Sequence, residues 1–242
     1  MVSILPALEP TLDVAALAPG DSAPPVIFIH GTRSSASVWD RQVAALGRRG
    51  IVASAVDLPG HGERSDETFS LDGAIAAIRD AVAASPAPPV LVGHSLGGYA
   101  ALAYAGGHED RIAGLVLSGC ATQLRPWVMA TYRHASHHIT RALRLGGGTW
   151  NVVTDMLTSM AAYSPLPDLR RLTVPMWLVS GRWDVLRFDE RRYLAARTWV
   201  GHQVFARAGH DIHVEMPGRY TRFVMEALAA LPSLRGAVPA TA

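Results

Sequence analysis

The chain has 242 residues, of which 49% are hydrophobic and 17% charged, a composition that excludes a disordered protein and fits one α/β domain with a substantial core. The formal net charge is only +2 and the arginines are scattered without a basic tract, so we expect no nucleic-acid partner. A single cysteine excludes an internal disulfide framework and fits a reducing compartment.

The sequence also bears on membrane association. It contains no apolar run of the length that a transmembrane helix needs. The N-terminal letters MVSILPALEP lack the basic start and the long apolar core of a signal peptide. We therefore expect a cytoplasmic protein without a membrane span that acts on a small molecule. The sequence does not indicate its oligomeric state.

Short apolar runs alternate with helical segments along most of the chain. In order, the sequence predicts a weak strand at residues 11–17, a strand at 26–29, a helix at 38–48 capped by Ser37, a strand at 51–56, a helix at 71–84 capped by Ser70, a strand at 90–92, a helix at 99–105, strands at 112–118 and 174–180, a helix at 188–199, a strand at 203–206 and a helix from Glu215 or Pro217 to 231, with a loose tail from Pro232. Such alternation is typical of an α/β fold with a mostly parallel, doubly wound sheet.

The alternation breaks between Ala121 and Leu169. Two aromatic-bearing helical stretches, 127–144 and 150–163, are separated by three consecutive glycines, and no strand is evident. We predict a small helical cap over residues 121–169, inserted after the strand that ends near Gly119. Residues 1–120 and 170–242 then form the core domain.

The stretch VLVGHSLGGY, from Val90 to Tyr99, has the pattern of a strand, a sharp turn and a helix. Ser95 lies at the apex of the turn, where its hydroxyl can stand clear of the backbone. Glycines at 93 and 97 leave room for strand and helix to pack closely, and the positive end of the helix favours an oxyanion beside Ser95. The stretch matches the G-x-S-x-G nucleophile elbow in its expected context.

A serine hydroxyl needs a base to accept its proton, and the base needs a carboxylate to orient it. Asp184 and His210 each follow a predicted strand, and the carboxyl ends of parallel strands meet at one edge of a sheet. Their positions favour Asp184 as the acid and His210 as the base. The competing candidates are Asp189 for the acid and His202 and His213 for the base, and Asp184 could instead cap a helix.

In this order the motifs resemble the α/β-hydrolase superfamily, in its cap-bearing, esterase- and lipase-like branch. The matching pieces are His30-Gly31 after a strand, Asp57 to Gly62, Gly93 to Gly98, Gly181 to Asp184, and Gly209-His210. The resemblance implies a triad of Ser95, Asp184 and His210, and an oxyanion hole made by the backbone N–H groups of Leu96 and Thr32. It implies no metal and no organic cofactor.

Several other residues have a structural and a functional interpretation. Many members of the superfamily carry a second glycine soon after His30-Gly31, but this loop reads TRSSAS, which could bring Arg33 or the serines into the site. We expect His30 to brace that loop, His61 to order the loop around it, and His94 to pack beneath the turn. The predicted cap contains His134, His137 and His138. The spacing of His134 and His138 suits two metal ligands on one helix face, but no third ligand is evident. The candidates for substrate binding are Arg33, Cys120, Trp127 and Trp150. The alternative for Cys120 is a small buried apolar role, and the two tryptophans could equally form the core of the cap.

The sequence therefore predicts a serine hydrolase that cleaves a small or medium carboxylic ester, or a thioester, through an acyl-enzyme on Ser95. Two alternatives use the same fold. One is a non-hydrolytic enzyme, such as a C–C lyase, a cyclase, an acyltransferase or a cofactor-free oxygenase, and the other is a ligand-binding receptor. The fold alone does not distinguish them.

Overall fold

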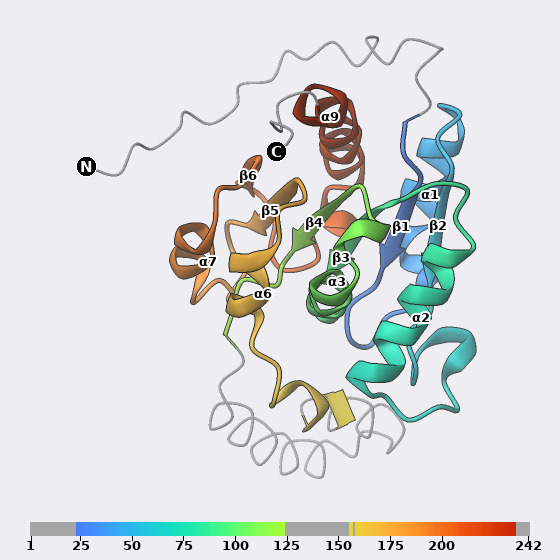
Figure 1. The fold of residues 1–242 in the computed structure, drawn as a ribbon, viewed down its shortest axis with the longest axis vertical. Coiled ribbons are helices and arrows are strands. Elements are labelled where there is room, and N and C mark those ends of the chain that lie inside the picture. Colours follow the sequence, from blue (N-terminus) through green and yellow to red (C-terminus); the bar gives the residue numbers. More distant parts are fainter. Residues whose placement is uncertain (1–22, 124–154, 157, 236–242) are drawn as a thin grey trace, which may run out of the picture.

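The computed structural model describes residues 23–123, 155–156 and 158–235, which build one central sheet with helices on both faces (Figure 1). The strands are β1 (Val26–Ile29), β2 (Ala53–Val56), β3 (Val90–His94), β4 (Gly114–Ser118), β5 (Met176–Gly181) and β6 (Gly201–Phe205). All neighbouring strands run parallel, in the order β2-β1-β3-β4-β5-β6. The predicted α/β class with a parallel, doubly wound sheet is confirmed.

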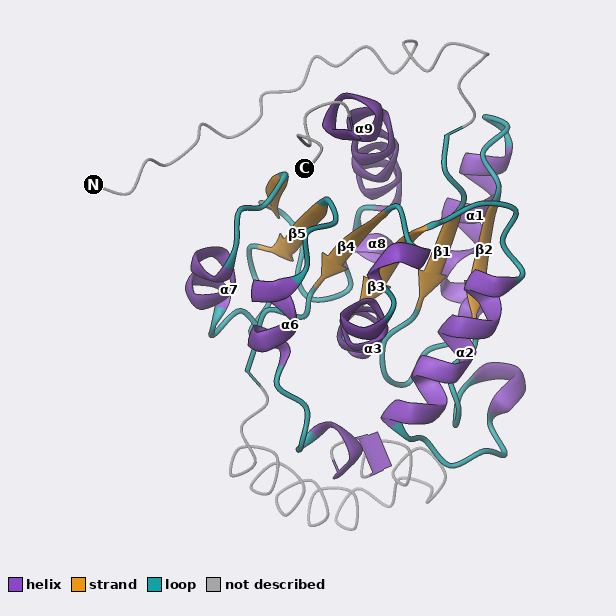
Figure 2. Ribbon diagram, in the orientation of Figure 1, coloured by secondary structure: helices purple, strands orange, loops and turns teal. Residues whose placement is uncertain are grey.

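The helices divide between the two faces of the sheet (Figure 2). One face carries α1 (Asp40–Gly47), α8 (Ile212–Glu215) and α9 (Pro217–Arg235), and the other carries α2 (Leu71–Ala83), α3 (Leu96–Gly107), α6 (Pro165–Arg171) and α7 (Glu190–Ala196). Short 3-10 turns at Ala36–Trp39, Gly62–Arg64 and Glu109–Arg111 complete the described elements.

Alternation along the strands builds a separate core on each face. Ile27 and Ile29 of β1 pack in the core beneath α2 and α3, whereas Val26 and Phe28 pack in the core beneath α1 and α9. The other central strands follow the same period of two. A strand that is apolar on both faces must be covered on both, which explains why the buried runs in the sequence predicted a parallel sheet.

The structure corrects several predicted boundaries. Ser37 does not cap α1, because it lies inside the 3-10 turn before the helix, and the free N–H of Ala36 donates instead to Asp57 Oδ1 at 2.7 Å. Ser70 does cap α2, accepting a hydrogen bond from Gly73 N–H at 3.0 Å. Helix α8 was not predicted, since four residues are too few to show a helical period. Helix α9 runs to Arg235 instead of ending at 231.

The predicted strand at 11–17 and most of the predicted cap, including the helix at 127–144, lie outside the described residues. Helix α6 spans the predicted boundary at residue 169 and packs against α3. No helix in the described part of the chain is both long enough and apolar enough to cross a membrane.

The topology places one strand end at the centre of the molecule. The chain passes from β1 outward to β2 and then returns to β3 on the other side of β1, and ligands bind at such switch points in open α/β sheets. Ser95 stands there, between β3 and α3, with φ 51° and ψ −117°. Its N–H donates to Ser118 O at 2.8 Å. A non-glycine residue in this conformation stores about 1–3 kcal/mol of strain.

Helix α3 can begin beside the end of β1 only because Gly97 has no side chain. A Cβ at Gly97 would lie 2.4 Å from Ile29 O and 2.5 Å from His30 O. Both neighbours are backbone atoms, so neither can rotate away.

We expect Gly97→Ala to lower the free energy of unfolding by about 1–3 kcal/mol, since the added methyl group must displace the backbone. Gly107→Ala, in the last turn of the same helix, is the matched control, because a Cβ there meets no atom within 4 Å. Urea denaturation of both variants checks this prediction. Equal stability of the two variants would contradict the close approach.

Candidate active site

A cleft of about 420 Å³ opens at the carboxyl ends of β1 and β3. Its lining brings together three of the residues that the sequence analysis singled out as the nucleophile, the base and an oxyanion donor, namely Ser95, His210 and Thr32. Arg33 also lines the cleft. The remaining lining residues are Gly31, Ser34, Val38, His94, Asp211, His213 and Val214.

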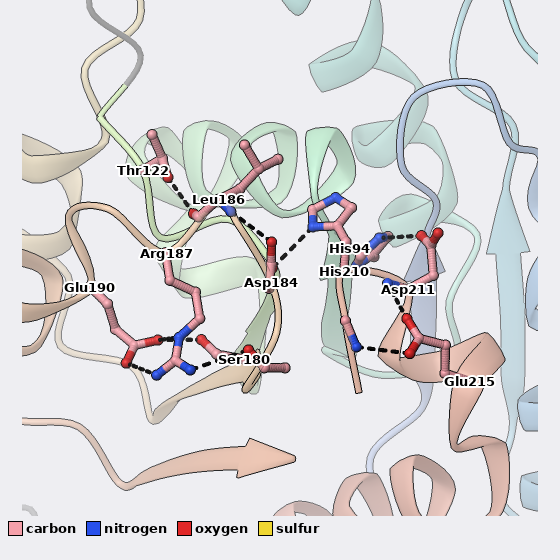
Figure 3. A network of polar contacts seen from close by, with 12 residues as sticks. His94, Thr122, Ser180, Asp184, Leu186, Arg187, Glu190, His210, Asp211 and Glu215 are labelled. Atoms are coloured by element: carbon pink, nitrogen blue, oxygen red, sulfur yellow. Dashed lines mark hydrogen bonds and ion pairs between the residues drawn. The ribbon is translucent and has the colours of Figure 1, made fainter. Parts of the chain in front are cut away.

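The carboxylate of Asp184 orients the imidazole of His210. His210 Nδ1 lies 3.0 Å from Asp184 Oδ2, and the side chain of Asp184 is fully buried. The second oxygen, Oδ1, accepts a hydrogen bond from Leu186 N–H at 2.8 Å, so both carboxylate oxygens have a partner. The close-up in Figure 3 shows this chain of contacts from Leu186 to His210. The carboxylate fixes Nδ1 as the protonated nitrogen and leaves Nε2 free to accept a proton.

The surroundings of His210 favour its protonated form. Burial alone lowers the pKa of His210, but the hydrogen bond and the negative charge of Asp184 outweigh burial and raise the pKa above 6.5. The neighbouring carboxylates of Asp211 and Glu215 act in the same direction. An imidazole in this setting can both take up a proton and hold it.

Four rings continue from His210 into the face that carries α1 and α9. The ring of His94 lies 4.8 Å from that of His210, and the ring of His213 lies 4.5 Å from that of His94. Trp39 stacks on His213 at 4.2 Å, and Phe28 stacks on Trp39 at 4.9 Å. We call these five rings the ring column.

The two inner histidines of the ring column stay neutral. Burial lowers the pKa of His213 to about 3. Burial also lowers the pKa of His94, whose Nε2 lies 3.2 Å from Asp211 Oδ1. As predicted, His94 packs beneath the turn. Sequence reasoning did not find Asp211, although its position next to His210 was a signal.

The loop after β1 is braced by His30. Its Nδ1 donates to Gly31 O at 2.8 Å and its Nε2 accepts from Leu58 N–H at 3.1 Å, which defines one neutral tautomer, and burial lowers the pKa of His30 to about 4. His61 Nδ1 lies 2.9 Å from Pro59 O. Both histidines therefore have the ordering roles that were predicted for them.

Two backbone N–H groups beside Ser95 remain available. Leu96 is the first residue of α3, where helical N–H groups have no intrahelical acceptor. Gly31 packs against the elbow, since a Cβ there would lie 3.0 Å from His94 and 3.2 Å from Ser95, and this contact brings Thr32 to the cleft. Neither the Leu96 nor the Thr32 N–H donates to any group in the described residues. Their position fits two donors for a developing oxyanion.

A buried network supports the loop that carries Asp184 (Figure 3). Glu190 accepts hydrogen bonds from Ser180 Oγ at 2.5 Å and from Arg187 Nε at 2.7 Å, and it lies 3.4 Å from His202 Nε2. Arg187 Nη1 also donates to Gly181 O at 3.2 Å. The network ties the end of β5 to the start of α7, so the loop between them has a fixed path. Sequence reasoning did not identify Glu190.

Glu215 orders the loop on the other side of His210. Its carboxylate accepts hydrogen bonds from Gly209 N–H at 2.8 Å and from Asp211 N–H at 3.2 Å. The two N–H groups flank His210, so the carboxylate fixes the backbone that presents the imidazole to the cleft.

Of the three competing residues, His213 lines the cleft but packs between His94 and Trp39 in the ring column, and the other two lie away from His210. Asp189 Oδ2 accepts from Gln123 N–H at 2.8 Å and does not contact His210. His202 lies inside β6, whereas the sequence placed it before the strand, and it pairs with Glu190. Cys120 is buried beneath Gly98, and burial raises the pKa of its thiol. The structure therefore does not bring Cys120 to the cleft, and Trp127 and Trp150 lie outside the described residues.

Across residues 23–123, 155–156 and 158–235, no group of three or more His, Cys, Asp or Glu side chains gathers in a way that could hold a metal ion.

The chain belongs to the alpha/beta hydrolase family, whose model matches residues 26–223. Among proteins of known sequence, it is 32% identical to the esterase Rv0045c of Mycobacterium tuberculosis over 74% of this chain and 61% of that protein. It is 39% identical to the pimeloyl-[acyl-carrier protein] methyl ester esterase of Neisseria meningitidis over 43% of this chain and 32% of that protein. The chain thus spans less than two thirds of the length of either esterase.

The fold has close counterparts among solved structures. NosK from Streptomyces actuosus superposes with a TM-score of 0.69 at 24% identity, over 87% of this chain and 99% of that chain. This likeness concerns the fold, and the family model confirms the resemblance to the superfamily that the sequence motifs indicated.

The Glu190 network yields a prediction about stability. Burial opposes ionisation of Glu190, but hydrogen bonds from His202, Arg187 and Ser180 lower its pKa to about 2. A carboxylate whose pKa is depressed on folding stabilises the folded state above its unfolded pKa, and this stabilisation is lost as the pH falls toward the folded pKa.

We therefore expect Glu190→Gln to lower the free energy of unfolding by about 1–3 kcal/mol at pH 7 and by clearly less at pH 3. Glu67→Gln, which removes an exposed partner of Arg64, should change little at either pH. Chemical denaturation at the two pH values measures both effects. A loss from Glu190→Gln that does not depend on pH would contradict this assignment.

Proposed function

We propose that the protein is a serine hydrolase that cleaves a small or medium carboxylic ester through an acyl-enzyme on Ser95. The observation that carries the proposal is the arrangement of Ser95 and His210 in one cleft, with His210 Nδ1 held 3.0 Å from the buried Asp184. Membership of the alpha/beta hydrolase family and similarity to two proteins named as esterases support the same reaction.

In the proposed reaction, Ser95 Oγ attacks the ester carbonyl carbon while its proton passes to His210 Nε2. Asp184 accepts the hydrogen bond from Nδ1 and stabilises the imidazolium that forms. His210 then gives the proton to the departing alcohol. Water attacks the acyl-enzyme with His210 again as base, which releases the acid and restores Ser95.

The oxyanion of each tetrahedral intermediate is assigned to the N–H groups of Leu96 and Thr32. Both are backbone donors, and both come from segments that are fixed before substrate binds: the first turn of α3 and the loop braced by His30. Donors of this kind lower the barrier by about 2.7–4 kcal/mol each, because they need no reorganisation during the reaction.

The dimensions of the cleft support a substrate of small or medium size. Its volume of about 420 Å³ lies near the lower end of the range for small-molecule sites, about 300–1,000 Å³. The strained backbone of Ser95 directs its hydroxyl away from the first turn of α3 and toward the cleft.

We expect Ser95→Ala to abolish labelling by a fluorophosphonate probe and to lower the hydrolysis of p-nitrophenyl acetate and butyrate by about 10³-fold or more. The variant removes the nucleophile and leaves the elbow glycines in place. Ser54→Ala, at an exposed position of β2, should keep labelling and turnover unchanged. Hydrolysis that survives in Ser95→Ala would overturn the proposal.

The raised pKa of His210 predicts the pH profile. His210 is a base only when neutral, so kcat/KM should rise with pH through a pKa above 6.5. Asp184→Asn removes the hydrogen bond and charge that raise this pKa. We expect it to move the rising limb to lower pH and to reduce kcat/KM on the order of 10³–10⁴-fold.

Asp189→Asn is the matched control for Asp184→Asn, since Asp189 is the neighbouring carboxylate and lies away from His210. The rising limb of kcat/KM against pH should lie at the same pH in Asp189→Asn as in wild type. An unshifted limb in Asp184→Asn, measured with p-nitrophenyl esters between pH 5 and 9, would show that Asp184 does not act through His210.

A further inference from the structure

Two residues other than glycine have a positive φ in the described part of the chain, and both line the cleft. They are Ser95, with φ 51°, and Arg33, with φ 62°. Backbone strain of this kind persists where the surrounding structure enforces it, and it concentrates at functional sites. The elbow accounts for the strain at Ser95. The proposed reaction does not explain the strain at Arg33.

The loop that carries Arg33 is held from both ends. His30 Nδ1 donates to Gly31 O at 2.8 Å on one side, and Ala36 N–H donates to Asp57 Oδ1 at 2.7 Å on the other. The hydrogen bonds on either side of Arg33 therefore hold the short segment in which position 33 adopts the left-handed conformation. Glycine would adopt it at lower cost. What arginine adds at this position is its side chain.

The Arg33 guanidinium has no protein partner in the described residues: it forms neither an ion pair nor a hydrogen bond there. The other charged side chain that lines the cleft is Asp211, whose carboxylate is engaged by His94 Nε2 at 3.2 Å. Most of the remaining lining is polar or small, with Val38 and Val214 as the apolar members. A planar guanidinium matches a carboxylate with two parallel hydrogen bonds.

We propose that Arg33 binds a free carboxylate of the substrate, so that the preferred substrates are esters carrying a second, unesterified carboxyl group. This inference rests on the proposed function, since it names the substrate class of the same cleft. Arg33 selects among esters and takes no part in bond making or breaking.

The test compares esters that differ only in this charge. The monomethyl and dimethyl esters of succinate, adipate and suberate vary the distance between the ester and the carboxylate on the acyl side. The pair 4-acetoxybenzoate and methyl 4-acetoxybenzoate places the charge on the alcohol side. We expect wild-type kcat/KM to be at least tenfold higher for the charged member of one pair, mainly through KM.

Three variants separate charge, geometry and strain at position 33. Arg33→Gln should remove the preference, so that its kcat/KM values for the charged and neutral members of the pair agree within about twofold. Arg33→Lys should retain part of the preference, and that part should shrink in 0.5 M salt. Arg33→Gly should lose the preference with an unchanged or higher melting temperature, because it relieves the strain. Arg48→Gln, which alters a cation at the C-terminal end of α1 that does not line the cleft, is the control.

The outcomes distinguish this inference from the proposed function. Equal kcat/KM for charged and neutral esters in wild type, or equal losses for both in Arg33→Gln, would overturn the role of Arg33 and leave the hydrolase intact. No hydrolysis of any ester, together with no fluorophosphonate labelling of Ser95, would overturn the hydrolase. Calorimetric titration with adipate gives a readout without turnover: binding by wild type that is lost in Arg33→Gln supports the inference, and no binding by either counts against it.

Discussion

The approach of α3 to the end of β1 is the constraint on which the rest of the site depends. Gly97 meets Ile29 O where any Cβ would collide, and Gly93 is equally confined by Gly97 and Gly98. This packing directs the N-terminus of α3 at the switch point, forces Ser95 into its strained conformation, and brings the loop after β1 against the elbow. The orientation of the hydroxyl and the position of both backbone donors therefore follow from steric exclusion, before any side chain of the cleft contributes.

A second property of the site is that one imidazole among several is set apart electrostatically. His30, His94 and His213 are buried and have lowered pKa values, whereas the pKa of His210 is raised by the buried carboxylate of Asp184. The distinction arises from both partner and depth. His30 meets only backbone groups through its hydrogen bonds. His94 also meets a carboxylate, but His94 is buried and its partner Asp211 is exposed, whereas His210 is partly exposed and its partner Asp184 is buried. The neutral rings fill space and fix loops. Because they add no positive charge beside His210, they do not oppose its protonation electrostatically.

The sequence predicted what depends on local pattern. The order of the motifs and the elbow rest on short segments whose chemistry is readable in place. The pairing of Asp184 with His210 was predictable because each follows a parallel strand, and such strands end at one edge of the sheet. The prediction failed at contacts between distant segments that no motif marks. Ser37 was expected to cap α1, but the N–H at that turn is taken by Asp57, which is 21 residues away. Asp211 was missed because its partner His94 lies 117 residues away and is brought to it by the order of strands in the sheet. Glu190 was missed because its contacts with Ser180 and His202 form only when α7 packs beside the ends of β5 and β6.

The ring column has a mechanical consequence. One face of the His210 imidazole rests against His94, which rests in turn on His213, Trp39 and Phe28 down to the strand β1. The packing of these rings opposes movement of the imidazole toward the sheet on the side of His94. The orientation of the His210 imidazole is thus set jointly by its hydrogen bond to Asp184 and by the tilted ring of His94 packed against it.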